Sequence, residues 1–460
     1  MQSMNNSNIY QQRRIALAKQ IYAKTGGGIA VIGTAPEMAR NRDSEFPYRH
    51  DSDFFYLTGF EEPGATLVLK VAGTSTEPQL ESHLFCRPKD AEREIWDGIR
   101  LGPSAAPETL GVEFAHSNDE LDSTLGKLLA DQKVIFVRLS ENAESDRHLR
   151  HWMKQVRQQS RAGINPPTEL HDIESLIHEM RLFKDAHELN TMRRAAEISA
   201  RAHIRAMQFC KPGIREYHLE AELLHEFRSS GAQSVAYNSI VAGGANSCIL
   251  HYRAGSTELR SGELCLIDAG CELDGYASDI TRTFPVNGKF NGPQRALYEI
   301  TLAAQEAAIA ATKPGNTFMQ PHEAALQVLT QGLLDTKLLK LSELGSLQNA
   351  IESAAYRRFY MHRTSHWLGM DVHDVGSYRE KLSIEQNSSE DKPWRVLQPG
   401  MTLTIEPGLY IRPADDIDES FWNIGIRIED DVYVNDSGCE LLSRGVPVNP
   451  EEIEALMKNQ

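Results

Sequence analysis

The sequence lacks long apolar runs, closely spaced cysteine pairs and an excess of positive charge. No stretch approaches the roughly 18 apolar residues of a membrane-spanning helix. A net charge of −16 over 460 residues disfavours nucleic acid and anionic membranes as partners, because binding phosphate requires a positive field. The 6 cysteines form no Cys-x-x-Cys motif, and residues 1–14 lack the apolar core of a signal peptide. We therefore expect a reduced, cytoplasmic protein that binds neither nucleic acid nor membrane.

The composition is that of an ordinary globular protein, and the length favours two domains. Hydrophobic residues make up 41% and charged residues 24% of the chain. The glycines of 26–33 lack the spacing of a phosphate-binding loop, so we interpret them as a turn that leads into a strand. Alternating strands and helices follow, and they predict a mixed α/β domain. The strands are expected at 65–71, 82–86 and 133–138, and the helices at 9–23, 120–130 and 145–158.

A polar, proline-containing segment at 158–168 is typical of a linker, and we place the domains at 1–175 and 176–460. The second domain is expected to combine strands with long helices. These helices are predicted at 186–210, 216–230, 293–312 and 321–334. The polar stretch 384–394 is expected to be a surface loop.

Two stretches of the second domain repeat each other and carry an acid at the same place. Residues 262–270 align with residues 400–408, so that Asp268 corresponds to Glu406. Each copy is followed by a second acid four residues after a glycine, namely Asp279 and Glu429. The repeat predicts an internally duplicated α+β domain.

The four acids have the distribution expected of a two-metal hydrolase. A turn sequence ending at Gly275 separates Asp268 from Asp279, so a hairpin can bring both carboxylates to one cavity. Four converging carboxylates would raise one another's pKa values, and divalent ions remove that cost. The alternative is that they are solvated charges at strand ends. Solvated strand-end charges are common for single acids. They do not explain why four acids recur in a repeated frame, each next to an apolar run.

Histidines supply the second signal, since His362, His366 and His373 fall within twelve residues. The glutamate of a zincin helix motif is missing. Oxygen-rich ligands with one imidazole favour Mn²⁺, and Zn²⁺ or Co²⁺ less distinctively. His251 is isolated, and its spacing alone favours a structural histidine.

Taken together, these motifs resemble the pita-bread metallopeptidases, and among them the bacterial type of the aminopeptidase P family. The resemblance covers nearly the whole chain. It rests on 52–60, 94–96, 178–183, 237–241, 248–252, 266–271, 278–285, 362–376, 405–410 and 425–429. It implies a creatinase-like α/β N-terminal domain followed by a pita-bread α+β domain with internal duplication.

The resemblance also implies roles for individual residues. The implied ligands of two divalent ions, most readily Mn²⁺, are Asp268, Asp279, His366, Glu406 and Glu429, with Asp279 and Glu429 bridging. Glu406 is the candidate general base, and His251 and His373 would share protons and orient the substrate. Implied substrate contacts are His362, Tyr237, Arg427 and, from a neighbouring subunit of a homotetramer, Trp96.

The implied activity is release of the N-terminal residue from peptides with proline in second position, through a hydroxide that bridges the metals. Two alternatives stay open. A prolidase, which cleaves only Xaa-Pro dipeptides, would share the ligands. A non-catalytic pita-bread binding module would be expected to have a broken ligand set, whereas all five positions here hold competent residues.

Overall fold

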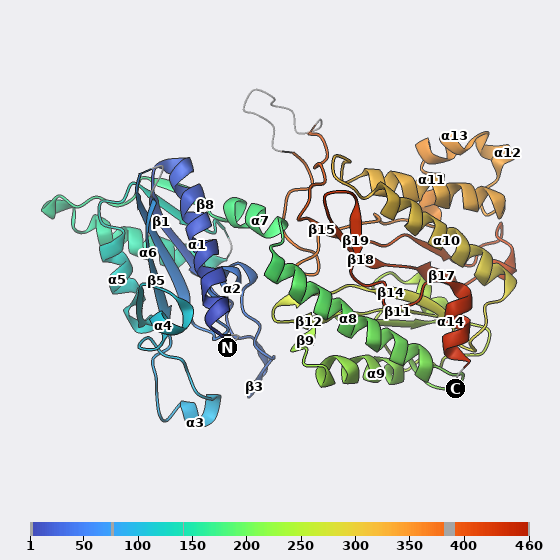
Figure 1. Cartoon of the computed structure of the whole chain (residues 1–460), viewed down its shortest axis with the longest axis horizontal. Coiled ribbons are helices and arrows are strands. Elements are labelled where there is room, and N and C mark those ends of the chain that lie inside the picture. The colour runs from blue at the N-terminus through green and yellow to red at the C-terminus, as the bar shows by residue number, and fades with distance from the viewer. Residues whose placement is uncertain (1–2, 75–77, 141, 381–391, 459–460) are drawn as a thin grey trace. The chain divides into compact units, whose positions relative to one another are not determined.

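The structure, a computed structural model, describes residues 3–74, 78–140, 142–380 and 392–458. It divides into two compact units, Met1–Met180 and Arg181–Gln460 (Figure 1). Across the described ranges, no helix is both long and apolar enough to span a bilayer.

The first unit is built on a mixed sheet with helices on both faces. The strand order is β6-β5-β4-β1-β7-β8, in which β1 pairs antiparallel with β4 and parallel with β7. The strands are β1 Gly28–Gly33, β4 Thr66–Gly73, β5 Pro78–Cys86, β6 Phe114–Ser117, β7 Val134–Val137 and β8 Glu169–Asp172, with a separate pair β2 Ala39–Asn41 and β3 Ser44–Glu45. The helices are α1 Ser3–Thr25, α2 Ser52–Thr58, α3 Glu94–Asp97, α4 Ala106–Leu110, α5 Leu121–Leu128, α6 Ala143–Arg157 and α7 Glu174–Leu182, with short 3₁₀ turns η1 Asn118–Glu120 and η2 Ser160–Ala162.

Successive side chains of a strand point to opposite faces of the sheet, which explains why helices cover both faces. Ile29, Val31 and Ile135 belong to one buried cluster with side chains of α5 and α6. The residues between them along each strand point to the opposite face of the sheet, where α1 lies against β4 and β5 (Figure 1). Before β1, Gly27 has φ +124°, and a Cβ there would lie 2.5 Å from the carbonyl oxygen of Val71. This glycine is therefore required by backbone packing, which supports the structural interpretation of 26–33.

The second unit combines small antiparallel sheets with long helices. Its strands are β9 Ser234–Val235, β10 Ile240–Gly243, β11 Leu264–Asp268, β12 Cys271–Leu273, β13 Tyr276–Ala277, β14 Thr281–Pro285, β15 Thr402–Ile405, β16 Gly408–Ile411, β17 Ile424–Arg427, β18 Asp430–Val434 and β19 Cys439–Leu441. Its helices are α8 Ala186–Phe209, α9 Glu216–Ser229, α10 Gly292–Ala311, α11 Gln320–Asp335, α12 Leu341–Leu344, α13 Leu347–Glu352 and α14 Pro450–Met457, with 3₁₀ turns η3 Gly244–Cys248, η4 Ala355–Arg358 and η5 Glu419–Phe421. Within this unit, α8 and α9 run together on one side of the strands, and α10 packs against α11 and β17 (Figure 1).

The duplication predicted from the acid repeat is present in the strand pairing. In the first copy β11 pairs with β14 and β12 with β13, and in the second copy β15 pairs with β18 and β16 with β17. The first hairpin turns at Asp274 and Gly275, both with positive φ, as expected of a tight hairpin. An isolated bridge between Thr281 and Glu429 joins the two copies. The expected α/β plus duplicated α+β architecture is thus confirmed.

The four long helices of the second unit lie within a residue or two of their expected bounds. The polar segment 158–168 differs from expectation, because it connects α6 to β8 inside the first unit instead of joining the units. Residue 158 caps α6, and β8 then adds to the sheet beside β7. Most of the loop expected at 384–394 lies outside the described residues.

Candidate metal centre

The predicted acids lie at or next to the ends of strands in the two repeated segments. Asp268 ends β11, Asp279 lies between β13 and β14, and Glu429 directly precedes β18. Gly270 permits this geometry, since a Cβ there would lie 1.7 Å from the carbonyl oxygen of Ser278. The corresponding Gly408 is also closely packed, with a Cβ position 2.8 Å from the carbonyl oxygen of Ile426. Both repeats therefore use glycine where the backbones that bear the acids approach each other.

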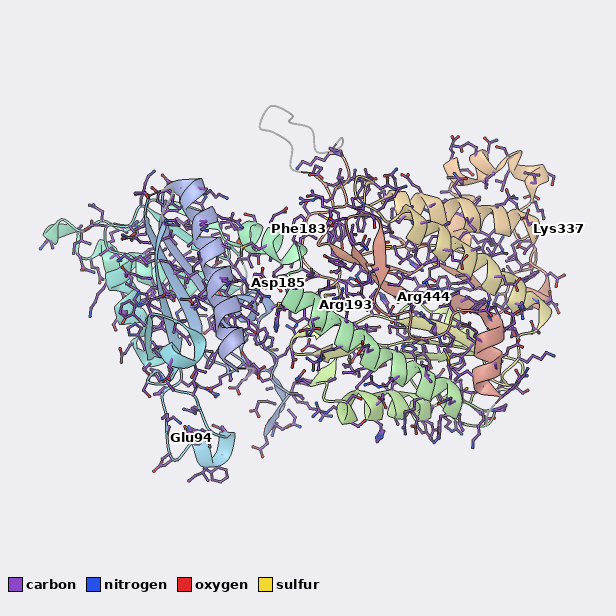
Figure 2. All side chains as sticks on the ribbon, viewed as in Figure 1. Glu94, Phe183, Asp185, Arg193, Lys337 and Arg444 are labelled. Carbon is purple, nitrogen blue, oxygen red and sulfur yellow. The ribbon has the colours of Figure 1, made fainter. Side chains whose placement is uncertain are left out.

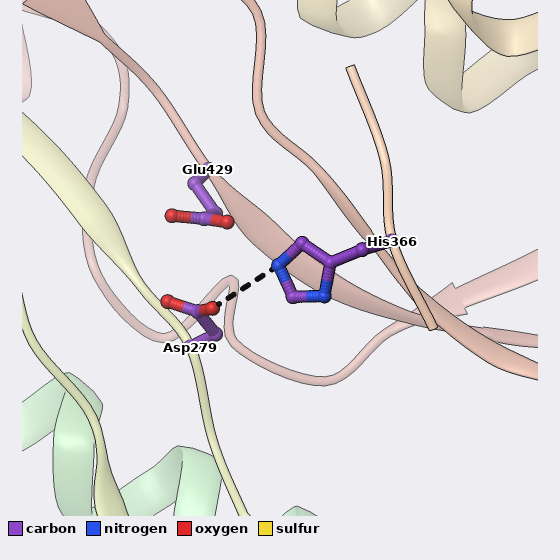
Figure 3. Close-up of side chains that lie close together, drawn as sticks. All are labelled: Asp279, His366 and Glu429. Carbon is purple, nitrogen blue, oxygen red and sulfur yellow. Dashed lines mark ion pairs between the residues drawn. The ribbon is translucent and has the colours of Figure 1, made fainter. Parts of the chain in front are cut away.

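Three of the predicted ligands form a compact group of donor atoms. One ligand atom from each of Asp279, His366 and Glu429 lies within 4.8 Å of the others, and all three residues are buried (Figure 3). The Nε2 atom of His366 lies 3.4 Å from Oδ2 of Asp279 and 3.6 Å from Oε1 of Glu406. Glu406 thus adjoins the same group from the second repeat.

Hydrogen bonds orient the imidazole of His366 for coordination. Its Nδ1 lies 2.9 Å from the carbonyl oxygen of Trp367, which can only accept, so Nδ1 carries the proton. Nε2 is therefore the ring atom that faces the carboxylates and that a metal ion would bind. The arrangement is the one that metal-binding histidines usually adopt.

Asp268, the fifth predicted ligand, is tied to the group by two further residues. The hydroxyl of Tyr237 lies 2.6 Å from Oδ1 of Asp268 and 2.5 Å from Oδ1 of Asp279. Arg427 donates from Nη2 to Oδ2 of Asp268 over 2.6 Å. The structure thus gathers all five predicted ligands around one space.

Burial and mutual repulsion shift the protonation of these groups. Burial, with the fields of Asp279 and Glu406 added, raises the pKa of Glu429 well above its ordinary value. Burial raises the pKa of Glu406 to about 7, against the opposing effect of His366. Burial disfavours the charged form of His366, but the hydrogen bond to Asp279 and the field of Glu406 outweigh it and raise the pKa to about 9. The donor set therefore fits divalent cations, which would replace these protons.

The group opens into a cavity of about 490 Å³, a size that suits a short peptide. Every predicted site residue except Trp96 lines it. The lining residues are Tyr237, Asn238, Ile240, Leu250, His251, Tyr252, Arg253, Asp268, Asp279, His362, Arg363, Ser365, His366, Val372, His373, Glu406, Arg427 and Glu429. His251 joins this set although its sequence context alone favoured a structural role.

A directed chain of hydrogen bonds runs along one wall of the cavity. Nδ1 of His362 donates to the carbonyl oxygen of Arg363, so Nε2 accepts from the hydroxyl of Tyr410 over 2.8 Å. Tyr410 in turn accepts from Nη1 of Arg427 over 3.0 Å. Burial, together with the charge of Arg427, lowers the pKa of His362 to about 3. His362 is thus a neutral, fixed side chain.

His373 lies against the ligand group without being part of it. Its ring centroid is 4.1 Å from that of His366, and burial and the neighbouring His366 lower its pKa to about 4. The next residue, Asp374, is buried and accepts from Nη2 of Arg181 at 2.6 Å and from Nζ of Lys184 at 3.0 Å. This ion cluster anchors the segment that carries His373.

Several residues that hold the predicted ligands in place were not predicted from the sequence. Thr281 donates to Oε2 of Glu429 over 2.6 Å and accepts from Nε of Arg427. Asp431 accepts from the backbone N–H of Asp279 through both carboxylate oxygens, at 3.2 and 3.1 Å. Each lies two residues after a predicted ligand, on the same strand face, and this spacing is a signal that could have found them.

Glu216, at the start of α9, holds the loop that carries His251. Its fully buried carboxylate accepts from the N–H groups of Gly243 and Gly255, from Nδ2 of Asn246 and from the hydroxyl of Tyr252, at 2.8–3.0 Å. The isolated position of Glu216 in the sequence offered no signal for this role.

We expect Glu216→Ala to lower kcat/KM about tenfold or more while metal content is unchanged. Four donors lose their acceptor, which costs on the order of 3 kcal/mol and frees the loop. Kinetics with amide hydrogen exchange over 244–257 measure this. Glu216→Gln should recover part of the activity, and Glu222→Ala, on the same helix, should behave as the parent. Unchanged exchange in Glu216→Ala would contradict the prediction.

The structure does not bring Trp96 into the cavity lining. Trp96 lies on α3 of the first unit and is 84% exposed, beside Ile95 and Ile99 at 81% and 84%. Figure 2 shows Glu94, on the same short helix, at the tip of a projection away from the sheet of that unit.

Comparison with known proteins assigns the class. Residues 190–436 match metallopeptidase family M24, and residues 10–136 match the N-terminal domain of aminopeptidase P. The chain belongs to metallopeptidase family M24 and is a hydrolase. This membership confirms the pita-bread fold and favours an enzyme over a non-catalytic binding module.

Individual relatives narrow the class further. The chain is 45% identical to Xaa-Pro aminopeptidase of Escherichia coli (strain K12) over 97% of both chains, and 42% identical to that of Haemophilus influenzae over 97% and 96%. Among solved structures, Pseudomonas aeruginosa aminopeptidase PepP matches with a TM-score of 0.92 and 47% identity over 98% of both chains. A zinc-substituted E. coli aminopeptidase P in complex with product matches with a TM-score of 0.91 and 44% identity over 98% of both chains.

Proposed function

We propose that the protein is an Xaa-Pro aminopeptidase, which releases the N-terminal residue from peptides with proline in second position. The observation that carries this proposal is the set of four carboxylates and one imidazole that lines a peptide-sized cavity, with the buried Asp279, His366 and Glu429 as its compact group. The similarity to curated Xaa-Pro aminopeptidases over nearly the whole chain supports the substrate class. Residues 176–460 would form the catalytic domain and residues 1–175 the N-terminal domain.

In this proposal two divalent ions, most readily Mn²⁺, are held by the predicted ligands. The ligands are Asp268, Asp279, His366, Glu406 and Glu429. Four anionic donors are more than one tetrahedral ion requires, and an oxygen-rich set suits Mn²⁺. Such ions lower the pKa of a bound water and polarise the carbonyl of the scissile bond.

The side chains of the cavity perform the remaining steps. Glu406 takes a proton from the attacking water and passes it to the leaving nitrogen. The acids at the base hold the free amino terminus by charge. His251 and His373 hydrogen-bond the peptide at the scissile bond. His362, fixed by Tyr410, lines the site for the proline ring, with Tyr237 and Arg427 keeping Asp268 in place.

A prolidase is the alternative, since it would use the same ligands on dipeptides alone. The deciding experiment incubates Mn²⁺-loaded protein with Ala-Pro-Ala and Ala-Pro in parallel, with Ala-Ala-Ala as the control peptide. Release of alanine from the first and not from the last supports the proposal. Cleavage of the dipeptide alone would establish a prolidase.

We also propose that the protein acts in the cytoplasm as a homotetramer, and at least as a homodimer, on peptide substrates. The negative net charge supports the absence of nucleic acid and membrane partners. The exposed Ile95, Trp96 and Ile99 support association, because three neighbouring large apolar side chains in water are costly for a monomer.

We expect Trp96→Ala to weaken assembly and to lower peptide cleavage about tenfold, with both metals retained. In the proposed assembly Trp96 walls the cleft of a neighbouring copy, and a buried aromatic anchor of this kind contributes about 2 kcal/mol. Light scattering coupled to size exclusion, kinetics and metal analysis measure the three effects. The matched control is Met38→Ala, at a 63% exposed apolar residue of the same unit. A fully active monomer at assay concentration would refute the assembly role.

A further inference from the structure

Two arginines of the cavity have no role in the reaction as derived above. The acids of the lining all belong to the proposed metal set, and Arg427 is paired with Asp268. Arg253 and Arg363 also line the cavity, and both are exposed. Within the part of the chain that the structure describes, neither forms an ion pair or a side-chain hydrogen bond. They are cations without a counter-charge in a chain whose net charge is −16.

Local contacts place both arginines at the cavity and leave their donors available. The guanidinium of Arg363 lies 5.1 Å from the ring centroid of Trp394, and Arg379 lies 3.2 Å from the same centroid. A cation–π contact orients a guanidinium without using its N–H groups. Arg253 follows Tyr252, whose hydroxyl is bound by the buried Glu216, so its backbone belongs to an anchored loop.

The polarity of a bound peptide connects these arginines to a ligand. Under the proposed function, on which this inference rests, the free amino terminus lies at the buried carboxylates. The chain then leads away from them, past the proline, to the third residue. In a tripeptide that residue carries a carboxylate, which would be repelled by the acids at the base of the cavity. Exposed lining cations are the groups that can compensate its charge.

We propose that Arg253 and Arg363 form a subsite for a carboxylate on the residue that follows proline. The ligand class is a carboxylate, from either the free C-terminus of a tripeptide or an Asp or Glu side chain at the third position of a longer peptide. Arg363 presents a planar fork to it, and Arg253 adds charge from the separate loop that carries His251. The subsite contributes to binding and leaves the bond-breaking step unchanged.

The test compares KM and kcat for four matched peptides. Ala-Pro-Ala and Ala-Pro-Ala-amide differ in the terminal carboxylate, and Ala-Pro-Glu-amide and Ala-Pro-Gln-amide differ in the side-chain carboxylate. We expect KM to be about fivefold lower for each carboxylate form, with equal kcat, as for a partly exposed charge pair. The difference should shrink at high salt, because exposed charges are screened.

The variants Arg363→Gln, Arg253→Gln and their combination should remove this advantage, leaving the two amide peptides Ala-Pro-Ala-amide and Ala-Pro-Gln-amide unaffected. The control is Arg357→Gln, which removes the same charge from an exposed arginine outside the cavity lining. If only the terminal carboxylate or only the side-chain carboxylate lowers KM, that carboxylate is the ligand of the subsite. Equal KM values for carboxylate and amide forms, or an advantage that survives in the double variant, would overturn the subsite. Failure to cleave any of the four peptides would instead refute the proposed function.

Discussion

Replacing Glu429 with glutamine is expected to lower kcat/KM roughly a thousandfold, about 4 kcal/mol of transition-state stabilisation, and to remove bound metal. Glu429 is 2% exposed, and one of its oxygens lies within 4.8 Å of donor atoms of Asp279 and His366. A neutral amide has the same shape but lacks the negative charge that cations bound at this site would need. Metal analysis by mass spectrometry and steady-state kinetics measure the two losses. Asp279→Asn should behave alike.

A stability measurement separates this loss from misfolding. Burial and neighbouring acids raise the pKa of Glu429, so in chelator its charge destabilises the folded protein above its ordinary pKa. The neutral glutamine relieves that cost, and the melting temperature in chelator should rise by about 2–4 °C for each kcal/mol. Glu440→Gln, at an exposed ion pair with Arg193, is the matched control and should keep metal and activity. Full metal content in Glu429→Gln would refute the ligand assignment.

Replacing His373 with alanine is expected to lower kcat roughly a hundredfold while both metals stay bound. Its ring packs against that of His366 at 4.1 Å, yet the compact donor group of Asp279, His366 and Glu429 does not include it. A neutral imidazole at this position can donate to the carbonyl of the bound peptide or accept from its N–H. That contact is absent in alanine, whereas the ligand atoms are untouched. Kinetics and metal analysis on the same preparation measure both quantities.

His225→Ala is the matched control, because His225 is exposed on α9 outside the cavity lining. It should leave kcat and metal content at parent values. Loss of both ions in His373→Ala would show that His366 is not the only imidazole ligand. Unchanged kcat would remove His373 from the proposed reaction.

The sequence by itself determined the features that depend on short segments. The acid repeat located both hairpins, because a strand presents alternate residues to one face and a tight turn needs residues that tolerate positive φ, such as Asp274 and Gly275. The N-terminus of α8 is similarly local, since Asp185 and Glu188 form a capping box. The same logic failed for 158–168, because a polar composition cannot tell a linker between units from a loop that returns to the sheet.

Only the tertiary structure decided which distant residues support the site. The chain from His362 through Tyr410 to Arg427 joins three segments, and its direction depends on which atoms can donate. Glu216 became a support for the His251 loop only when the chain placed its carboxylate among four donors. Burial in the folded protein removes these carboxylates from water, so their charges repel one another more strongly and favour bound cations. Such contacts join residues up to 159 positions apart, as between Asp268 and Arg427, and a local sequence pattern carries no information about pairing at that range.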